Sequence, residues 1–286
     1  MHISVMPRET VEMLAVKPDG IYLDCTCGMG GHTRLIAERL TTGYVIANDR
    51  DTESLEIARR NTAECASRIC FHYGGFASLD EAVTQAGFEK LDGLVADLGV
   101  SMYQLTEPAR GFSFMQDGPL DMRLDQTRGK TAEDLVNHSD ERTLADLIYQ
   151  FGEERRARRI ARAIVRARPI RSTLRLADVV ERAVPRTGRL HPATKTFMAL
   201  RMAVNDEPGE LRRLLDIGPE LLKKGGRMVV LSFMSIDDRQ VKERFRALGQ
   251  EGRATILTRH PLTPGEEECA RNAASRSARL RALEMN

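Results

Sequence analysis

A short glycine-rich stretch, DCTCGMGGH (Asp24 to His32), is the first part of the chain whose composition points to chemistry. Its three glycines follow an apolar run, GIYL, and precede a segment with helical spacing of apolar residues. A bare turn between a strand and a helix exposes backbone N–H groups that hold an anionic or polar ligand. The dinucleotide fingerprint fails because Thr33 stands at its third glycine, and the chain contains no Walker phosphate loop.

The spacing of an acid and these glycines narrows the choice of ligand. Asp24 ends the first predicted strand, and the pattern Asp24-x-x-x-Gly28-x-Gly30-Gly31 resembles the cofactor loop of class I S-adenosylmethionine-dependent methyltransferases. That cofactor has a carboxylate for backbone amides and an ammonium group that needs an acidic partner. Because such a turn also occurs for purely structural reasons, the loop alone does not decide between the two interpretations.

A second acid favours an adenosine-bearing cofactor. Asp49 ends the next predicted strand, YVIAND, where a carboxylate accepts hydrogen bonds from both ribose hydroxyls, a geometry that also serves NAD. Asp51 is expected in the first turn of the following helix, where a negative charge favours the helix dipole. After the third predicted strand, Phe76 in GGF is placed either to cover an adenine or to pack in the core.

The sequence pattern predicts an α/β fold that positions these residues. Short β-type runs alternate with helical segments over the first part of the chain, which indicates a parallel sheet with crossover helices. Strands are predicted at residues 21–24, 44–49, 69–74, 91–99, 225–235, 254–260 and 277–284, and the helix after the second strand at residues 50–66. No clear strand appears between residues 104 and 207. We therefore expect a Rossmann-like core of residues 1–103 and 208–286 and an inserted all-helical domain of residues 104–207.

Composition excludes several classes of protein. At 286 residues and 42% hydrophobic content the chain can bury a core, and its net charge of +2 says little about partners. No apolar run approaches the roughly 18 residues of a membrane span, and the N-terminus lacks a signal-peptide core. We expect a cytoplasmic protein without membrane contact. Five cysteines without CxxC pairs predict free thiols, and histidines without ligand spacing predict no metal site.

Arginine gathers in one stretch, EERRARRIARAIVRARPIRS, from residue 153 to 172. Apolar residues recur in it at helical spacing, which predicts an amphipathic helix with an arginine-covered outer face. Arg156 and Arg159 on that face are candidate contacts to the phosphates of a nucleic acid. The alternative is a solvated helix whose arginines pair with Glu153 and Glu154.

The segment EPARGFSFMQDGPLDMRLD, residues 107–125, is too polar to be read as core. Arg110, Asp117 and Arg123 in this segment are candidates for the wall of a pocket that receives a target base. An ordinary folded loop with internal salt bridges is the alternative.

Longer strings make the resemblance specific. DLGVSMYQLTEPARGFSFMQDGPLDMRLD (residues 97–125), HPATKTFMALRMAVNDE and RNAASRSARLRALE resemble segments of the bacterial 16S ribosomal RNA cytosine-N4 methyltransferase family, and such matches run in order over nearly the whole chain. The resemblance implies methyl transfer from S-adenosyl-L-methionine to the N4 amino group of a decoding-centre cytosine, cytosine 1402 of 16S rRNA, with the small ribosomal subunit as partner.

The resemblance also implies individual site residues. Cofactor contacts are expected at Gly30, Gly31, His32, Asp49, Phe76, Asp97 and Gln104, to which the loop pattern adds Gly28. Asp97 ends the fourth predicted strand beside the expected methyl group, and it is the candidate catalytic residue that orients cofactor or base. The chain departs from the family at Met234, which stands where a histidine is usual, and at Ser101-Met102, where two serines are usual. An obligatory base at position 234 is thereby in doubt.

Two other classes of protein stay open at this point. An NAD-dependent oxidoreductase has a similar sheet, although the missing third glycine argues against it. A non-catalytic RNA-binding protein could have kept a cofactor fold. The residues also leave open whether the chain is a monomer or a homodimer, and whether naked rRNA, a precursor or the assembled subunit is the substrate.

Overall fold

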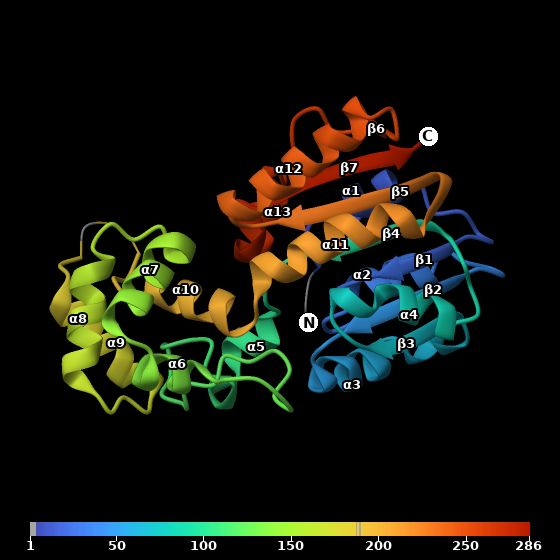
Figure 1. Cartoon of the computed structure of the whole chain (residues 1–286). Coiled ribbons are helices and arrows are strands. Elements are labelled where there is room, and N and C mark those ends of the chain that lie inside the picture. The colour runs from blue at the N-terminus through green and yellow to red at the C-terminus, as the bar shows by residue number, and fades with distance from the viewer. Residues whose placement is uncertain (1–3, 187, 189) are drawn as a thin grey trace. The chain divides into compact units, whose positions relative to one another are not determined.

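The computed structural model describes residues 4–186, 188 and 190–286, which divide into two compact units. Unit 1 consists of Met1–Gly99 and Pro208–Asn286, and unit 2 of Val100–Glu207. Figure 1 shows the first unit in blue to teal and in orange to red, with the second in green to yellow between them in the sequence. The insertion predicted at residues 104–207 falls inside unit 2.

A seven-stranded, mostly parallel sheet forms the centre of unit 1, in the order β3-β2-β1-β4-β5-β7-β6. The strands are β1 (Ile21–Asp24), β2 (Tyr44–Asp49), β3 (Ile69–Tyr73), β4 (Leu91–Asp97), β5 (Leu222–Ser232), β6 (Ala254–Ile256) and β7 (Arg279–Met285). The strand β7 pairs antiparallel with β5 and β6. The sheet and its helices (Figure 1) confirm the predicted Rossmann-like α/β class.

Helices cover both faces of this sheet, so its strands are apolar on both sides. On β1, Leu23 packs in one core with the helices α4 (Leu79–Gln85), α11 (Glu207–Leu221) and α12 (Ser235–Gln250). Its neighbour Tyr22 points to the opposite core, with α1 (Pro7–Leu14), α2 (Gly31–Ala37) and α3 (Thr52–Asn61). The helix α13 (Glu266–Arg271) follows β6 in this unit.

Unit 2 is helical and has its own core. Its helices are α5 (Met102–Thr106), α6 (Ala132–His138), α7 (Glu141–Gly152), α8 (Ala157–Ala167), α9 (Thr173–Ala183) and α10 (Thr194–Val204). Apolar residues of α6 to α10 form one buried cluster with Phe112, Leu120 and Met122 of the preceding loop. Among the described residues of the unit there is no strand, only an isolated bridge between Pro119 and Ser172.

Some predicted boundaries are wrong. The helix predicted at residues 50–66 ends at Asn61, because Thr62 leaves the helical conformation and its hydroxyl donates to the carbonyl of Ala58 at 2.8 Å. A short 3-10 helix, Ala63–Arg68, follows it. The strand predicted at residues 254–260 ends at Ile256, because the N–H groups of Leu257 and Thr258 both turn to the carbonyl of Ala282.

Candidate active site

Three aspartates end three neighbouring strands of unit 1: Asp24 on β1, Asp49 on β2 and Asp97 on β4. These strands are adjacent and parallel, so their carboxyl ends meet at one edge of the sheet. In an open parallel sheet this edge is where ligands bind. The fold therefore brings the three predicted strand-end acids to the expected place.

The glycine loop follows β1 and leads into α2. Gly28 and Gly30 have positive φ angles of 51° and 86°, a backbone conformation that residues with a Cβ rarely adopt. A Cβ on Gly30 would lie 2.9 Å from Thr62 Cγ2 and 3.3 Å from Ala58, so this glycine also allows the loop to pack against α3. Gly31 is the first residue of α2. Glycines in this loop are therefore explained by packing against α3 as well as by ligand binding.

Asp24 organises this loop from inside. It is fully buried, its Oδ2 accepts from the Thr33 hydroxyl at 2.7 Å, and its Oδ1 accepts from the Thr26 N–H at 3.1 Å. Burial raises the pKa of this carboxyl to about 6. Its two oxygens already have donors, one in the loop and one in α2, so Asp24 shapes the site through the conformation of residues 25–31.

Asp49 joins the same loop to the next strand. Its Oδ2 accepts from the Gly28 N–H at 2.7 Å and its Oδ1 from the Asp51 N–H at 2.9 Å. Burial raises its pKa to about 6. Each carboxylate oxygen has two lone pairs, so both oxygens can accept a further hydrogen bond. Asp51 was expected in the first turn of α3 and is its N-cap, accepting from Glu53 and Ser54.

Asp97 differs from the other two acids, because one of its oxygens has no donor. Its N–H donates to Thr26 Oγ1 at 2.6 Å and its Oδ2 lies 3.7 Å from His32 Nδ1. Its Oδ1 is buried and, among the described residues, has no hydrogen-bond partner. The pKa of this carboxyl is raised to about 6, mainly by burial and also by the charge of Asp24, against a lowering by His32. A buried oxygen in this state costs free energy unless a cation or an N–H donor meets it.

Phe76 follows β3 and begins a short 3-10 helix, Phe76–Ser78. Its N–H donates to Glu210 Oε2 on α11 at 2.8 Å, and a Cβ on Gly75 would lie 2.9 Å from the same oxygen. Glu210 also forms an ion pair with Arg213 at 2.7 Å. The sequence offered no signal for this contact, because Glu210 and Phe76 are 134 residues apart.

Two further residues singled out in the sequence lie near the ends of helices. Gln104 in unit 2 is buried and closes a capping box on α5: its Oε1 accepts from the Ser101 N–H at 2.8 Å, and its N–H donates to Ser101 Oγ. Met234 belongs to unit 1 and is the N-cap residue of α12, shortly after the end of β5.

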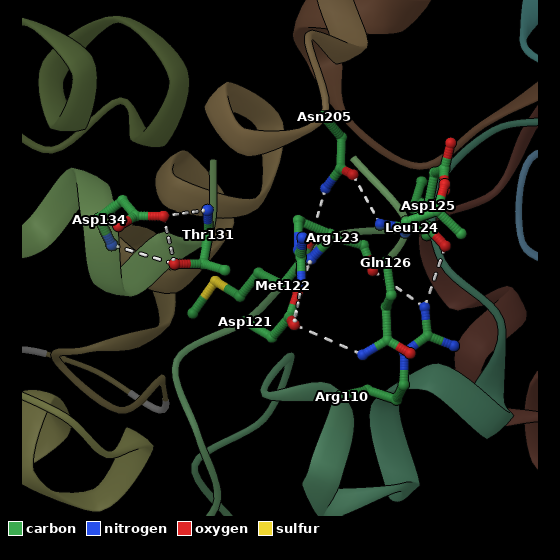
Figure 2. A network of polar contacts seen from close by, with 11 residues as sticks. Arg110, Asp121, Met122, Arg123, Leu124, Asp125, Gln126, Thr131, Asp134 and Asn205 are labelled. Atoms are coloured by element: carbon green, nitrogen blue, oxygen red, sulfur yellow. Dashed lines mark hydrogen bonds and ion pairs between the residues drawn. The ribbon is translucent and has the colours of Figure 1, made fainter. Parts of the chain in front are cut away.

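Figure 2 shows the loop of residues 110–126, where the charged side chains contact one another or the backbone. The view that this segment is too polar for a core is wrong for Arg110, which is 2% exposed and donates from Nη2 to the carbonyls of Arg123 and Leu124 at 2.9 and 3.1 Å. Arg123 forms a bidentate ion pair with Asp121, with both N–O distances 2.8 Å. Asn205 accepts from the Leu124 N–H at 2.8 Å.

Asp117 has a local partner as well. Its Oδ1 accepts from the Leu174 N–H at 3.2 Å near the start of α9, and hydrogen bonds from Ser172 and Leu174 lower its pKa. Arg110, Asp117 and Arg123 therefore all have partners inside unit 2, and the Arg123–Asp121 pair is an internal salt bridge of the kind that the folded-loop alternative describes.

The arginine-rich segment forms α8, whose buried residues are Ala157, Ile160, Ala161 and Ile164. This confirms the predicted amphipathic helix. Arg162 on its outer face lies 3.4 Å from Glu141, whereas Arg159 and Arg166 are exposed and form no ion pair within the part of the chain that the structure describes.

Arg156, the other predicted phosphate contact, is the N-cap residue of α8. Its backbone N–H donates to Glu154 Oε1 at 2.9 Å, and its Nη1 donates to the Pro185 carbonyl at 3.3 Å. The pairing with Glu154 that the solvated-helix alternative describes thus involves the backbone of this arginine. Its side chain is exposed.

The arrangement in unit 1 fits S-adenosylmethionine. This molecule presents two cationic groups, a carboxylate and two ribose hydroxyls. Asp97 Oδ1 is an acceptor that lacks a donor, and Asp49 keeps free lone pairs. Within the described residues no cluster of three or more His, Cys, Asp or Glu side chains is arranged to hold a metal, and no helix there has the length and apolar content to cross a membrane.

Comparison with known proteins gives the family. The model of the MraW methylase family matches residues 1–286. The chain is 75% identical over 285 residues to the "Ribosomal RNA small subunit methyltransferase H" of Solibacter usitatus, with 100% of both chains covered. It is 48% identical to the protein of that name from Acidobacterium capsulatum, with 99% of this chain and 98% of the relative covered. The chain therefore belongs to the MraW methylase family.

Proposed function

We propose that this chain transfers a methyl group from S-adenosyl-L-methionine to the N4 amino group of one decoding-centre cytosine in 16S rRNA of the small ribosomal subunit. The names of the relatives support the small-subunit rRNA as substrate. The observation that carries the chemistry is the buried Asp97 Oδ1, which lacks a donor at the carboxyl end of β4. This oxygen is an acceptor for a proton of the amino group that is methylated.

The nature of the target amine explains why an acceptor matters. The N4 lone pair of cytosine is delocalised into the ring, so the amine is a weak nucleophile. A carboxylate that accepts one N4 proton localises the lone pair, and in-line positioning of the two reactants contributes much of the rate. As the amine gains the methyl group that the bound cofactor would supply, one N4 proton would pass to the acceptor. Asp97 has this role in the proposal.

The cofactor is held in this proposal by Gly28, Gly30, Gly31, His32, Asp49, Phe76, Asp97 and Gln104. When bound it supplies the methyl group on a sulfonium. The loop amides would receive its carboxylate, Asp49 would accept from the ribose hydroxyls and Phe76 would cover the adenine. Met234 contributes packing at the end of β5, because a thioether takes up no proton at neutral pH.

Unit 2 recognises the RNA in this proposal. Arg156, Arg159 and Arg166, which are exposed at the start and on the outer face of α8, contact phosphates, and such contacts position the substrate without reading its sequence. Arg110, Asp117 and Arg123 of this unit are the proposed contacts to the target nucleotide, and their contacts within the loop and with α9 hold them in place. The base must leave its stack to reach the reacting methyl group.

Methyl transfer to small-subunit rRNA tests this function. Purified chain is incubated with isotopically labelled S-adenosyl-L-methionine and either naked 16S rRNA, a precursor particle or assembled subunits, and the nucleosides are analysed by mass spectrometry. We expect N4-methylcytidine at a single position. A 5-methylcytidine product would contradict the mechanism, and no transfer to any of the three substrates would favour a non-catalytic RNA-binding protein.

A further inference from the structure

His32 has contacts on both sides of its ring. It is the second residue of α2 and is 5% exposed. Its Nε2 lies 3.0 Å from the backbone carbonyl of Val5, and its Nδ1 lies 3.7 Å from Asp97 Oδ2. One nitrogen therefore faces the N-terminal segment and the other faces the acid at the end of β4.

The Val5 contact determines where the ring carries its proton. A backbone carbonyl only accepts hydrogen bonds, so Nε2 must be the protonated nitrogen of the neutral ring. The lone pair of Nδ1 then faces Asp97 Oδ2. Two acceptors that face each other share one added proton readily, and the pair can hold that proton on either atom.

The Val5 carbonyl is itself held in place. Val5 and Met6 are buried, and the Met6 N–H donates to Glu268 Oε1 on α13 at 2.6 Å. The Met6 carbonyl accepts from the Thr10 N–H in α1. The N-terminal segment thus joins α1, α13 and the His32 ring, which keeps the ring from rotating away from Asp97.

Asp97 has different surroundings at its two oxygens. Oδ2 faces His32, whereas Oδ1 has no partner among the described residues. The titratable groups that act on this carboxyl are His32 on α2 and Asp24 at the end of β1. Asp24 receives donors from Thr26 and Thr33 on its two oxygens, so of these two groups it is His32 that offers Asp97 a site for a proton.

We propose that His32 is a positioning residue for Asp97: with one proton shared between Nδ1 and Oδ2, the ring orients the carboxylate so that Oδ1 meets the reacting amine. This inference rests on the proposed function. The step balances, because the proton lost from the amine goes to Oδ1 and leaves from there to solvent. The proton shared between Oδ2 and Nδ1 stays in place throughout.

Two substitutions separate this role from a purely structural one. The glutamine of His32→Gln keeps an N–H donor at the position of Nε2 for Val5 but removes the nitrogen that faces Asp97. His32→Asn keeps a polar group at the position of Nδ1 but removes the bond to Val5. His72→Gln is the matched control, because His72 on β3 also bonds through one ring nitrogen, at 2.8 Å, but to the neutral side chain of Asn48.

The kinetic result expected is a loss of kcat of about 100-fold in His32→Gln, a smaller loss in His32→Asn and none in His72→Gln. KM for the RNA should stay within about twofold in all three, because none of these groups is proposed to contact the RNA. The acidic limb of the kcat–pH profile should move to higher pH in His32→Gln, since His32 lowers the pKa of Asp97. Full activity of His32→Gln with loss in His32→Asn would show a structural role and overturn the proposal.

A second measurement uses the free protein and needs no methyl transfer. Imidazole ¹⁵N NMR of the histidine-labelled chain, with the His32 signal assigned by its absence in His32→Gln, reports the tautomer directly. We expect the proton on Nε2 at alkaline pH and a titration of the His32 signal that changes in Asp97→Asn. A neutral ring with its proton on Nδ1 and not on Nε2 at alkaline pH, or a titration that Asp97→Asn leaves unchanged, would overturn the proposal even if the chain methylates rRNA as proposed.

Discussion

The sheet edge of unit 1 and the loop of residues 110–126 in unit 2 both contain several charged side chains, but they differ in whether these charges have hydrogen-bond or ion-pair partners. In the loop, Arg123 pairs with Asp121, and Arg110 donates to two backbone carbonyls. At the sheet edge, Asp97 keeps a buried oxygen without a donor among the described residues. Charged groups with partners stabilise the fold. A buried acceptor without a donor lowers the free energy of unfolding and is typical of a binding or catalytic site.

The contrast predicts opposite responses to neutralisation. Removing a charge from the loop leaves its partners unsatisfied, so the fold should weaken. Removing the charge of Asp97 relieves an unfavourable burial, so the fold should strengthen while function is lost.

Arg110→Met should destabilise unit 2 by about 2 to 4 kcal/mol, because the carbonyls of Arg123 and Leu124 lose their buried donor. Hydrogen exchange of the core amides of α7 and α10 measures this free energy for the unit itself. Arg128→Met is the matched control: Arg128 pairs with Asp125 at 2.6 Å, but its side chain is 70% exposed, and its loss should cost under about 1 kcal/mol. Equal effects of the two substitutions would contradict the scaffold role of Arg110.

Asp49→Ala should weaken cofactor binding by about 1 to 3 kcal/mol, because two ribose hydroxyls lose a charged acceptor and the Gly28 N–H loses its partner. Calorimetry with S-adenosyl-L-methionine on the purified chain measures the change. Asp92→Ala serves as a control, since this acid lies at the start of β4 and pairs with Lys223 at 2.7 Å. Unchanged affinity in Asp49→Ala would remove Asp49 from the site.

Asp97→Asn should stabilise the fold at pH 8 by about 1 to 2 kcal/mol and give no gain at pH 4. Burial raises the pKa of this carboxyl from 3.8 to about 6, so the folded state binds the proton more tightly than the unfolded state. The wild-type acid therefore lowers stability increasingly as pH rises between about 4 and 6, and asparagine removes that effect. Urea unfolding at both pH values, followed through the strands of unit 1, tests the sign; destabilisation at pH 8 would contradict it.

Replacing Arg159 and Arg166 with glutamine should lower RNA affinity by about 0.5 to 1 kcal/mol per residue at moderate salt. The slope of log affinity against log salt should fall by about one for each lost phosphate contact. Arg162→Gln on the same helix is the control, because Arg162 already has Glu141 at 3.4 Å. If the slope is the same for all variants, the outer face of α8 is a solvated surface.

Much of the fold was predictable because its signals are local. The apolar runs that end in Asp24, Asp49 and Asp97 are separated by helical segments, and parallel strands bring their carboxyl ends together whatever the loops between them do. The same logic placed the glycine loop beside these acids. The apolar spacing of α8 was likewise sufficient to predict its buried face.

The missed features depend on contacts between distant segments. Nothing in the composition of residues 107–125 indicated that Arg110 would be buried, because its acceptors are backbone carbonyls, which every residue carries. The contact between His32 and the Val5 carbonyl could not be predicted for the same reason. Glu210 was missed because its partner is the backbone N–H of Phe76, far away in the sequence.

Single-turnover methyl transfer by Asp97→Asn tests the central claim most directly, with nucleoside mass spectrometry of the small-subunit rRNA as readout. Asparagine keeps the shape of the side chain but removes the charge that accepts the N4 proton. We predict a rate of N4-methylcytidine formation at least about 100-fold below wild type, with RNA affinity unchanged within about twofold. A variant that forms N4-methylcytidine at the wild-type rate would contradict the assignment of Asp97 as the acceptor.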